Sequence, residues 1–404
     1  MGGTSFDVGI VHDGKPAFSY TSLVHQYAYY LSKVDIQTIG AGGGSKAWID
    51  ETSGMLRVGP ESAGAAPGPA CYGRGGETAT VTDADLILGY LDGDNFAGGT
   101  MQLDRAAAEA ALQKIAEPLG LSLQETAAGI VKIAEFQMAD LIRKVTIQKG
   151  FDPRDFVLFA FGGAGPVHAG VFARELGVAK VIVPQRETAS VWCAFGAAAA
   201  DVLHVHERVN MMRSPFDVTI VNGLLGELKN HAEAELAADD IAPEQRHLRF
   251  SLDMRHKGQI NEVEVEISGA ELAEADLPGL HDAFVAQYER LYGKGASLPG
   301  AQLELVTYRC RAAAETLKPR LTRSKTLSEI IAPEAVRPAR PVYWSEPGVT
   351  METAVFEGEK LVPGNSLSGP AIVETADTTV VVHPGQILLV DEFGNIELTL
   401  EAAN

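Results

Sequence analysis

The stretch Phe156-Val-Leu-Phe-Ala-Phe-Gly-Gly-Ala-Gly-Pro-Val-His-Ala-Gly170 changes character halfway along its length. Its first six residues are continuously apolar, which is typical of a buried strand in a parallel sheet. The glycines that follow remove the side chains at the end of this strand, and Pro166 suits the first turn of a helix. The stretch therefore predicts a strand, a glycine turn and a helix, the repeating unit of an α/β fold.

The glycine turn is also a candidate nucleotide site. Backbone N–H groups at the start of a helix point outward, and a phosphate or a ribose can approach them closely where Gly162, Gly163 and Gly165 carry no side chains. The same turn occurs in α/β folds that bind nothing there, so this stretch leaves both interpretations open. His168, in the first helical turn, is either a packed histidine or a nucleotide contact.

A second loop of small residues lies at the start of the sequence, where Gly2-Gly-Thr-Ser5 precedes Asp7. Two apolar segments broken at Asp13-Gly14 follow it and predict a β-hairpin. N–H groups, hydroxyls and a carboxylate at the mouth of a hairpin suit a phosphate and its Mg²⁺, which Asp7 can hold through water. Taken alone, this motif is weak.

A third loop, Ile39-Gly-Ala-Gly-Gly-Gly-Ser-Lys46, follows the strand-like residues 34–39. Four of its five positions from 40 to 44 are glycine, and each glycine costs backbone entropy on folding. We therefore expect another group to lie close against this backbone.

Five motifs in this order resemble those of the hydantoinase A/oxoprolinase family, and the resemblance covers nearly the whole chain. The family contains ATP-dependent N-methylhydantoinases, 5-oxoprolinases and subunits of acetone and acetophenone carboxylases. The motifs are Gly2-Gly-Thr-Ser-x-Asp7, Asp35-Ile-x-Thr-Ile-Gly-Ala-Gly-Gly-Gly-Ser45, Arg57-Val-Gly-Pro-Glu-Ser-Ala-Gly-Ala-x-Pro-Gly-Pro-Ala-Cys-Tyr-Gly73, Val81-Thr-Asp-Ala-Asp-Leu86 and Phe161-Gly-Gly-Ala-Gly-Pro-x-His168.

The resemblance implies an actin-like, sugar-kinase-like ATPase fold of two halves, with ATP and Mg²⁺ in the cleft between them. On that pattern residues 2–7 form the second phosphate loop, residues 162–164 form the adenosine loop, Thr4 and Asp7 are catalytic, and Asp7 holds the metal. Two departures stand out: Phe6 replaces the usual Thr, and the family's first half would precede Met1, so we expect a truncated or split member. The expected nucleotide-binding residues are Gly2, Gly3, Thr4, Ser5, Gly42, Gly43, Gly44, Ser45, Gly162, Gly163 and Ala164.

Composition limits the class of partner and the compartment. A formal net charge of −20 over 404 residues argues against binding to nucleic acid or to an anionic membrane. No stretch approaches the ~18 apolar residues of a membrane span, and no secretory signal opens the sequence. Three widely separated cysteines form no disulfide framework, which fits a reducing cytoplasm. We expect Cys193 to be a buried structural thiol.

Periodicity divides the chain. Apolar residues at helical spacing predict helices after Asp104 and over residues 123–148, and an N-terminal cap is the preferred role of the Thr82-Asp-Ala-Asp85 segment over metal binding. Beyond about residue 210 the chain changes, and alternating residues predict strands over residues 248–254 and 262–267. We therefore expect an ATPase half with a parallel sheet and helices at residues 1–210, an α+β region at 211–317, a proline-rich linker at 318–341 and a β-rich segment at 342–404.

Residues 59–76 are rich in Gly, Pro and Ala and cannot form a regular helix. Long irregular segments within globular proteins are usually functional or disordered. The presence of Glu61 and Tyr72 favours an ordered cleft wall over a simple connecting loop.

Two functions remain open. In the first, the chain is the ATP-using subunit of a two-component enzyme, which phosphorylates the carbonyl oxygen of a cyclic amide or of an enolised ketone for hydrolysis or carboxylation. Trp192 and Cys193 depart from the hydantoinase pattern and lean towards the ketone carboxylases. The partners would be a hydantoinase B-like subunit and a chain that supplies the first half. In the second, the chain is a non-catalytic scaffold.

Overall fold

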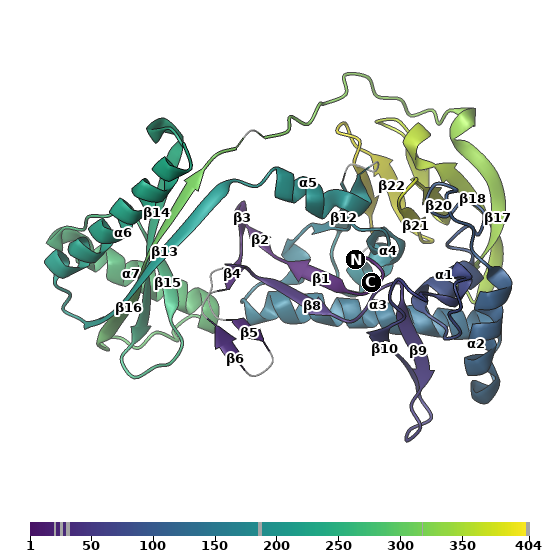
Figure 1. Ribbon diagram of the computed structural model, residues 1–404, viewed down its shortest axis with the longest axis horizontal. Helices are drawn as coiled ribbons and strands as arrows, with labels where there is room; N and C mark the ends of the chain where they lie inside the picture. Colours follow the sequence, from purple (N-terminus) through teal and green to yellow (C-terminus); the bar gives the residue numbers. More distant parts are fainter. Residues whose placement is uncertain (20–21, 25–26, 30–32, 185–187, 317, 401–404) are drawn as a thin grey trace. The chain divides into compact units, whose positions relative to one another are not determined.

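The computed structural model describes residues 1–400 except 20–21, 25–26, 30–32, 185–187 and 317, and the chain divides into two compact units (Figure 1). Unit 1 joins Met1–Gly196 to Leu321–Asn404, and unit 2 is the segment between them, Ala197–Arg320. Each unit has a hydrophobic core of its own. Residues 342–404 were expected to form a separate segment, but they belong to the same unit as the N-terminal part of the chain.

The helices of unit 1 begin at residues that cap them. Thr80 caps α1, because its hydroxyl accepts the N–H of Asp83 while the Asp83 carboxylate accepts the N–H of Thr80. Thr82 is therefore not the cap, and its hydroxyl donates to the Gly43 carbonyl instead. Asp104 caps α2, as expected. A capping box of Ser122 and Glu125, which was not predicted, starts the long α3. The helices are α1 (Val81–Leu88), α2 (Arg105–Leu119), α3 (Leu123–Gln148), α4 (Gly165–Glu175) and α5 (Trp192–Ala198).

The predicted strand, glycine turn and helix are confirmed, but the sheet around them is mixed, not parallel. Strands β11 and β12 flank α4 and pair in parallel, whereas β12 pairs antiparallel with β23. The apolar run is not a buried strand either, because β11 is an edge of the described sheet and Phe159 is 55% exposed. The sheet order is β11 (Leu158–Phe159), β12 (Lys180–Val183), β23 (Ile396–Thr399), β22 (Ile387–Val390) and β19 (Ser366–Ser368).

The described residues among the first 62 contain short antiparallel pairs, several of which lie against α3 in Figure 1. The hairpin predicted at Asp13-Gly14 is confirmed, since β2 and β3 pair on either side of it. The pairs are β1 (Phe6–Gly9) with β8 (Ile36–Ile39), β2 (Val11–His12) with β3 (Lys15–Pro16), β4 (Phe18–Ser19) with β7 (Lys33–Val34), β5 (Ser22–Val24) with β6 (Tyr27–Tyr29), and β9 (Ser45–Ile49) with β10 (Leu56–Ser62).

A four-stranded sheet completes unit 1. Its first strand, β17, begins at Val336, inside the expected linker, and it pairs with β18 across a register shift between Arg337 and Arg340. The order is β17 (Val336–Trp344), β18 (Val349–Glu357), β20 (Ala371–Glu374) and β21 (Thr379–Val382), with β18 and β20 parallel.

Unit 2 is an α+β structure. An antiparallel sheet packs its apolar side chains against two helices, and together they form the second core. The sheet order is β13 (Val202–Arg213), β16 (Leu303–Ala314), β14 (Arg246–His256) and β15 (Val263–Ile267), and the helices are α6 (Val218–Ala238) and α7 (Leu277–Tyr292). In the described part of the whole chain, no helix combines the length and the apolar character needed to cross a bilayer.

Candidate functional site

The three glycine loops meet at one cavity in unit 1. Backbone from all three lines this space of about 160 Å³, and hydrogen bonds hold the loops together. The N–H of Gly43 donates to the Gly2 carbonyl (3.0 Å), and the N–H of Ala164 donates to the Met1 carbonyl (3.2 Å). Five of the residues predicted to bind nucleotide therefore come together here: Gly2, Gly3, Gly43, Gly163 and Ala164.

The glycines of this site fall into two groups. A Cβ atom at Gly2 or Gly3 would meet nothing within 4 Å, and one at Gly163 would meet only the Asp377 carbonyl oxygen at 3.5 Å. Packing does not require glycine at these three positions, so the open backbone beside the cavity fits the close approach of a ligand. This is the observation that favours a nucleotide there.

The other glycines are explained by the protein itself. A Cβ at Gly42 would lie 2.7 Å from the Gly3 backbone, and one at Gly44 would lie 2.9 Å from the Gly3 carbonyl oxygen. The group that we expected against the third loop is thus the chain's own N-terminal loop. Gly162 has φ +85°, and a Cβ there would meet the Met1 carbonyl oxygen at 2.2 Å.

The remaining predicted residues do not line the cavity. Asp7 is exposed on β1, and its carboxylate accepts hydrogen bonds from the hydroxyls of Ser5 (2.9 Å) and Thr38 (2.6 Å). Ser45 is buried, and its hydroxyl oxygen accepts the Gly42 N–H (2.8 Å), so it supports the loop from inside. Outside the cavity lining are Thr4, Ser5, Asp7, Gly42, Gly44, Ser45 and Gly162.

A metal site is not preformed in the described residues, which contain no group of three or more His, Cys, Asp or Glu side chains placed to hold an ion. Mg²⁺ in phosphate-transferring enzymes is commonly held by one or two carboxylates together with the phosphates. The role of Asp7 as a metal ligand therefore stays a prediction.

The polar wall of the cavity comes largely from residues that the sequence did not single out. Tyr72 confirms that residues 59–76 contribute an ordered wall, whereas Glu61 is exposed and pairs with Lys46. A turn near the C-terminus supplies the opposite side. The polar side chains in the wall are Tyr72, Thr82, Asp85, Asp92, Asn95, Glu374, Thr375, Asp377, Thr378 and Thr379.

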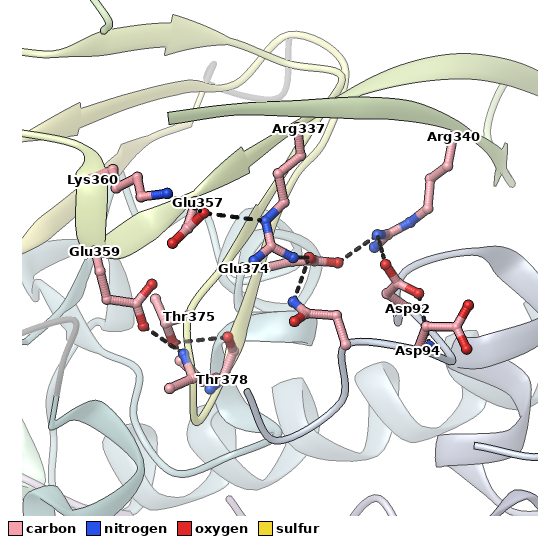
Figure 2. A network of polar contacts seen from close by, with 12 residues as sticks. Asp92, Asp94, Arg337, Arg340, Glu357, Glu359, Lys360, Glu374, Thr375 and Thr378 are labelled. Carbon is pink, nitrogen blue, oxygen red and sulfur yellow. Dashed lines mark hydrogen bonds and ion pairs between the residues drawn. The ribbon is translucent and has the colours of Figure 1, made fainter. Parts of the chain in front are cut away.

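Glu374 ties this turn to the segment after α1 (Figure 2). Its carboxylate accepts hydrogen bonds from Arg337 (3.1 Å), Arg340 and Asn95 (3.0 Å). Arg340 also donates to the carbonyl oxygens of Gly89 (2.9 Å) and Tyr90 (3.0 Å), just beyond the end of α1. The C-terminal strands β17 and β20 thereby hold one wall of the cavity in place.

The same turn is bonded to the glycine turn before α4. The Thr378 hydroxyl donates to the Gly163 carbonyl (3.0 Å), and the Asp377 carboxylate accepts hydrogen bonds from the hydroxyls of Ser190 and Thr375. Segments from both ends of unit 1 thus form one continuous cavity wall.

Three buried titratable residues lie in contact with the cavity or directly behind its lining. Asp85 on α1 lines the cavity, and its Oδ2 lies 3.5 Å from Nε2 of His168 on α4. The Nδ1 of His168 lies 3.3 Å from Oε1 of Glu135 on α3. Their exposed fractions are 2%, 0% and 4% for Asp85, His168 and Glu135, so water does not screen the interactions between them. His168 is therefore a packed histidine.

Burial and mutual charge shift the pKa values of this cluster. Burial raises the pKa of Asp85 to about 7 although His168 opposes the shift, and burial also raises the pKa of Glu135. Burial alone would lower the pKa of His168, but the carboxylates of Asp85 and Glu135 outweigh it and raise that pKa. All three groups therefore hold their protons to a higher pH than they would in the unfolded chain.

One sign of this cluster is visible in the sequence. Glu135 falls on the buried face of α3, between Val131 and Met138, where a charged residue needs a partner. Another expectation was wrong: Cys193 is exposed on α5, since no residue of that short helix is buried.

Comparison with known proteins identifies the class. Residues 1–206 match the hydantoinase/oxoprolinase family, and residues 217–400 match the hydantoinase/oxoprolinase C-terminal domain. The chain belongs to this family.

Its similarity to particular relatives extends along the whole chain. It is 37% identical to caprolactamase subunit alpha of Pseudomonas jessenii and 33% identical to the acetophenone carboxylase gamma subunit of Aromatoleum aromaticum. These alignments cover 99% and 98% of this chain but 57% and 55% of those proteins, so the chain spans about half the length of these relatives.

Two solved structures have the same fold. The crystal structure of the ATP-dependent caprolactamase from Pseudomonas jessenii superimposes with a TM-score of 0.87 at 36% identity, covering 99% of this chain and 58% of that one. The nucleotide-free acetone carboxylase structure gives 0.77 at 31% identity, covering 98% and 57%.

Proposed function

We propose that this chain is the ATP-using part of an enzyme that activates a carbonyl group by phosphorylation, for later hydrolysis or carboxylation. The observation that carries this proposal is the open backbone of Gly2, Gly3 and Gly163 around one cavity. Relatives described as an ATP-dependent caprolactamase, a 5-oxoprolinase and carboxylase subunits support a common use of ATP.

The roles of the residues follow from phosphoryl transfer, which depends mostly on positioning and on neutralising charge. N–H groups of the loop at residues 2–5 would bind phosphate oxygens, and the turn at residues 162–164 would contact the adenosine. Asp7, together with Thr4 of the same loop, would hold the Mg²⁺ that accompanies ATP and supplies positive charge. A second half-domain of the actin-like type would cover the nucleotide from the other side.

The substrate is a cyclic amide or a ketone. Relatives at similar identity act on either class according to their names, so neither is preferred on similarity. The departures at Trp192 and Cys193 favour a ketone carboxylase, and both residues lie on the exposed α5. A non-catalytic scaffold is the alternative that a failure of nucleotide binding would support.

Photolabelling with 8-azido-ATP tests the nucleotide site. We expect labelled peptides to include residues 162–175 or 374–379, with labelling suppressed by excess ATP and weakened by chelation of Mg²⁺. Peptides of α6 and α7 serve as the internal control, because they belong to the other unit. Labelling that is uniform along the chain, or unaffected by ATP, would refute the proposed site.

A further inference from the structure

The floor of the cavity carries a carboxylate oxygen that the protein itself does not satisfy. Asp85 is 2% exposed, and its Oδ1 has no hydrogen-bond partner among the residues that the structure describes. A buried polar atom left without a partner costs about 1–3 kcal/mol. Because Asp85 also lines the cavity, a group that enters the cavity can supply the missing hydrogen bond.

The other side of Asp85 is connected to further titratable groups. His168 lies between the carboxylates of Asp85 (3.5 Å) and Glu135 (3.3 Å), and each of the three residues comes from a different helix. When Asp85 has lost its proton, the positive charge of a protonated His168 between the two carboxylates compensates the negative charge on Asp85. Asp85 can therefore gain or lose a proton without leaving an isolated buried charge.

Phosphorylation of either substrate class releases one proton. The carbonyl oxygen forms a bond to the γ-phosphorus of ATP, the bond from that phosphorus to the bridging oxygen breaks, and ADP leaves with the electron pair. The hydrogen on the atom beside the carbonyl carbon, nitrogen in a cyclic amide or carbon in a ketone, departs as a proton. Its bonding pair becomes the new C=N or C=C double bond, so a proton acceptor is needed in both cases.

We propose that Oδ1 of Asp85 accepts this proton, and that His168 and Glu135 act as positioning residues behind it. The inference rests on the proposed function and extends it to the residue that handles the proton. A base is most efficient when its pKa lies near the working pH, and the pKa of Asp85 is about 7.

Charged and titratable groups from α1, α3 and α4 act on Asp85 and on the residues behind it. His383 is uncharged near neutrality, since burial lowers its pKa to about 3, and Arg174 is the cation that acts on Glu135. The groups that act on this cluster include Asp83 on α1, Tyr90 beyond α1, Glu135 on α3, His168, Arg174 and Glu175 on α4, His383 beyond β21, and the N-terminal ammonium, which lowers the pKa of His168.

The test uses the protein tagged at its C-terminus and isolated from its own cells with any subunits that accompany it. ADP formation is measured with caprolactam, 5-oxoproline, acetone and acetophenone as probes. We expect Asp85→Asn to lower substrate-dependent ADP formation by about 10²–10⁴-fold, the usual contribution of a general base. Binding of an ATP analogue should change less than ~2-fold, since Asn preserves the shape of the site. Asp104→Asn is the matched control, because Asn caps α2 as well as Asp does.

A second readout does not depend on turnover. With ¹³C-labelled histidine, the NMR titration of His168 should show a lower pKa in Asp85→Asn and in Glu135→Gln, since each change removes an anion beside the ring. In Glu135→Gln the acidic limb of the pH profile should also move to lower pH, because the charge of Glu135 raises the pKa of Asp85.

The outcomes separate the two proposals. If Asp85→Asn turns over substrate at the wild-type rate, the role of Asp85 as the proton acceptor is refuted, but the proposed function is not. An unchanged His168 titration would refute the positioning roles. Absence of substrate-dependent ADP formation in the wild-type protein would refute the proposed function and this inference with it.

Discussion

Gly163 differs from the adjacent Gly162 in what a side chain there would meet. The nearest atom to an added Cβ is 3.5 Å away, so Gly163→Val should fold normally while its methyl groups occupy the cavity. We expect the affinity for an ATP analogue to fall at least ~10-fold, which corresponds to about 1.4 kcal/mol. Calorimetry on the native complex measures this loss.

The matched control for that change is Gly223→Val on α6, where an added Cβ also meets nothing within 4 Å but lies in the other unit. Equal affinities in the two variants would mean that Gly163 does not contact the nucleotide. A large fall in the melting temperature of Gly163→Val would instead show that packing requires the glycine.

Asp85 also predicts how stability varies with pH. Its pKa in the folded protein, about 7, lies above the ordinary value of 3.8. Its contribution to stability is therefore complete below pH 4 and is lost as the pH rises through 7, because the folded state binds more protons than the unfolded state. The pKa values of Glu135 and His168 are raised as well, so their contributions fall in the same direction.

Thermal unfolding of Asp85→Asn at pH 5 and pH 8 checks this sign. We expect the variant to gain about 2 °C or more relative to the wild type between the two pH values, which corresponds to roughly 1 kcal/mol or more in a unit of this size. A difference that stays constant with pH would contradict the raised pKa.

The limits of sequence reading are clear at this scale in two aspartates of α1. Asp83 and Asp85 both looked like helix-capping residues, and Asp83 is one, with N–H donors from Ala70, Cys71 and Thr80. Asp85 is two residues further along α1, so its side chain leaves the helix about 200° away from that of Asp83 around the helix axis, on a different face. Its partner His168 lies far along the chain, so no local pattern could pair them.

Arg340 joins two elements that the sequence did not connect. It donates to two carbonyl oxygens beyond α1 and pairs with Glu374, whose side chain is 4% exposed. Arg340→Ala should destabilise the protein by about 2–4 kcal/mol, because it leaves a buried carboxylate short of its partner. Urea unfolding measures the change.

Lys360→Ala is the control for this variant. Lys360 also pairs with a glutamate, but its side chain is 45% exposed, and such surface pairs contribute about 0–1 kcal/mol. If the two variants lost the same stability, the contacts in Figure 2 would not hold the cavity wall.

Helices and strands with a clear repeat of apolar residues could be predicted from the sequence, but the pairing partners of the strands could not. The stripe of apolar residues on α3 and the alternation in β14 and β15 were sufficient, since burial on one face imposes those periods. The pairing of β12 with β23 was not visible, because both strands have only four residues, and local pattern allows such short strands to pair with many others. The parallel sheet was therefore wrongly expected.

At the scale of the whole molecule, the relatives suggest an assembly. They are described as alpha, beta and gamma subunits, and each is nearly twice as long as this chain. We predict a stable complex with a hydantoinase B-like subunit, with ATP turnover dependent on both. The reason is that the proposed phosphorylation uses the cavity residues, whereas the described residues include no metal-binding cluster for the following step.

Co-expression with the candidate subunit and size-exclusion chromatography tests this prediction. Joint elution, with ADP formation that rises on mixing, is the expected result. A chain that elutes alone, with the same ATPase rate whether or not the subunit is present, would rule out the partnership.

The family could be predicted from the order of its motifs, and with it the use of ATP by its members. Each motif lies where backbone geometry limits the choice of residue. The division into units did not follow, since Leu321–Asn404 returns to the first unit after an insertion of 124 residues, Ala197–Arg320. Only contacts made in three dimensions show which segments share a core.

Strand β23 has a consequence for synthesis on the ribosome. It lies between β12 and β22, so the five-stranded sheet remains in two pieces until residues 396–399 have left the exit tunnel. At about 5–20 residues per second, translation needs roughly 10–40 s to pass from β12 to β23. During that interval the nascent chain carries an unpaired edge of β12 and a complete sequence for unit 2, and we expect chaperones that shield strand edges to slow its aggregation.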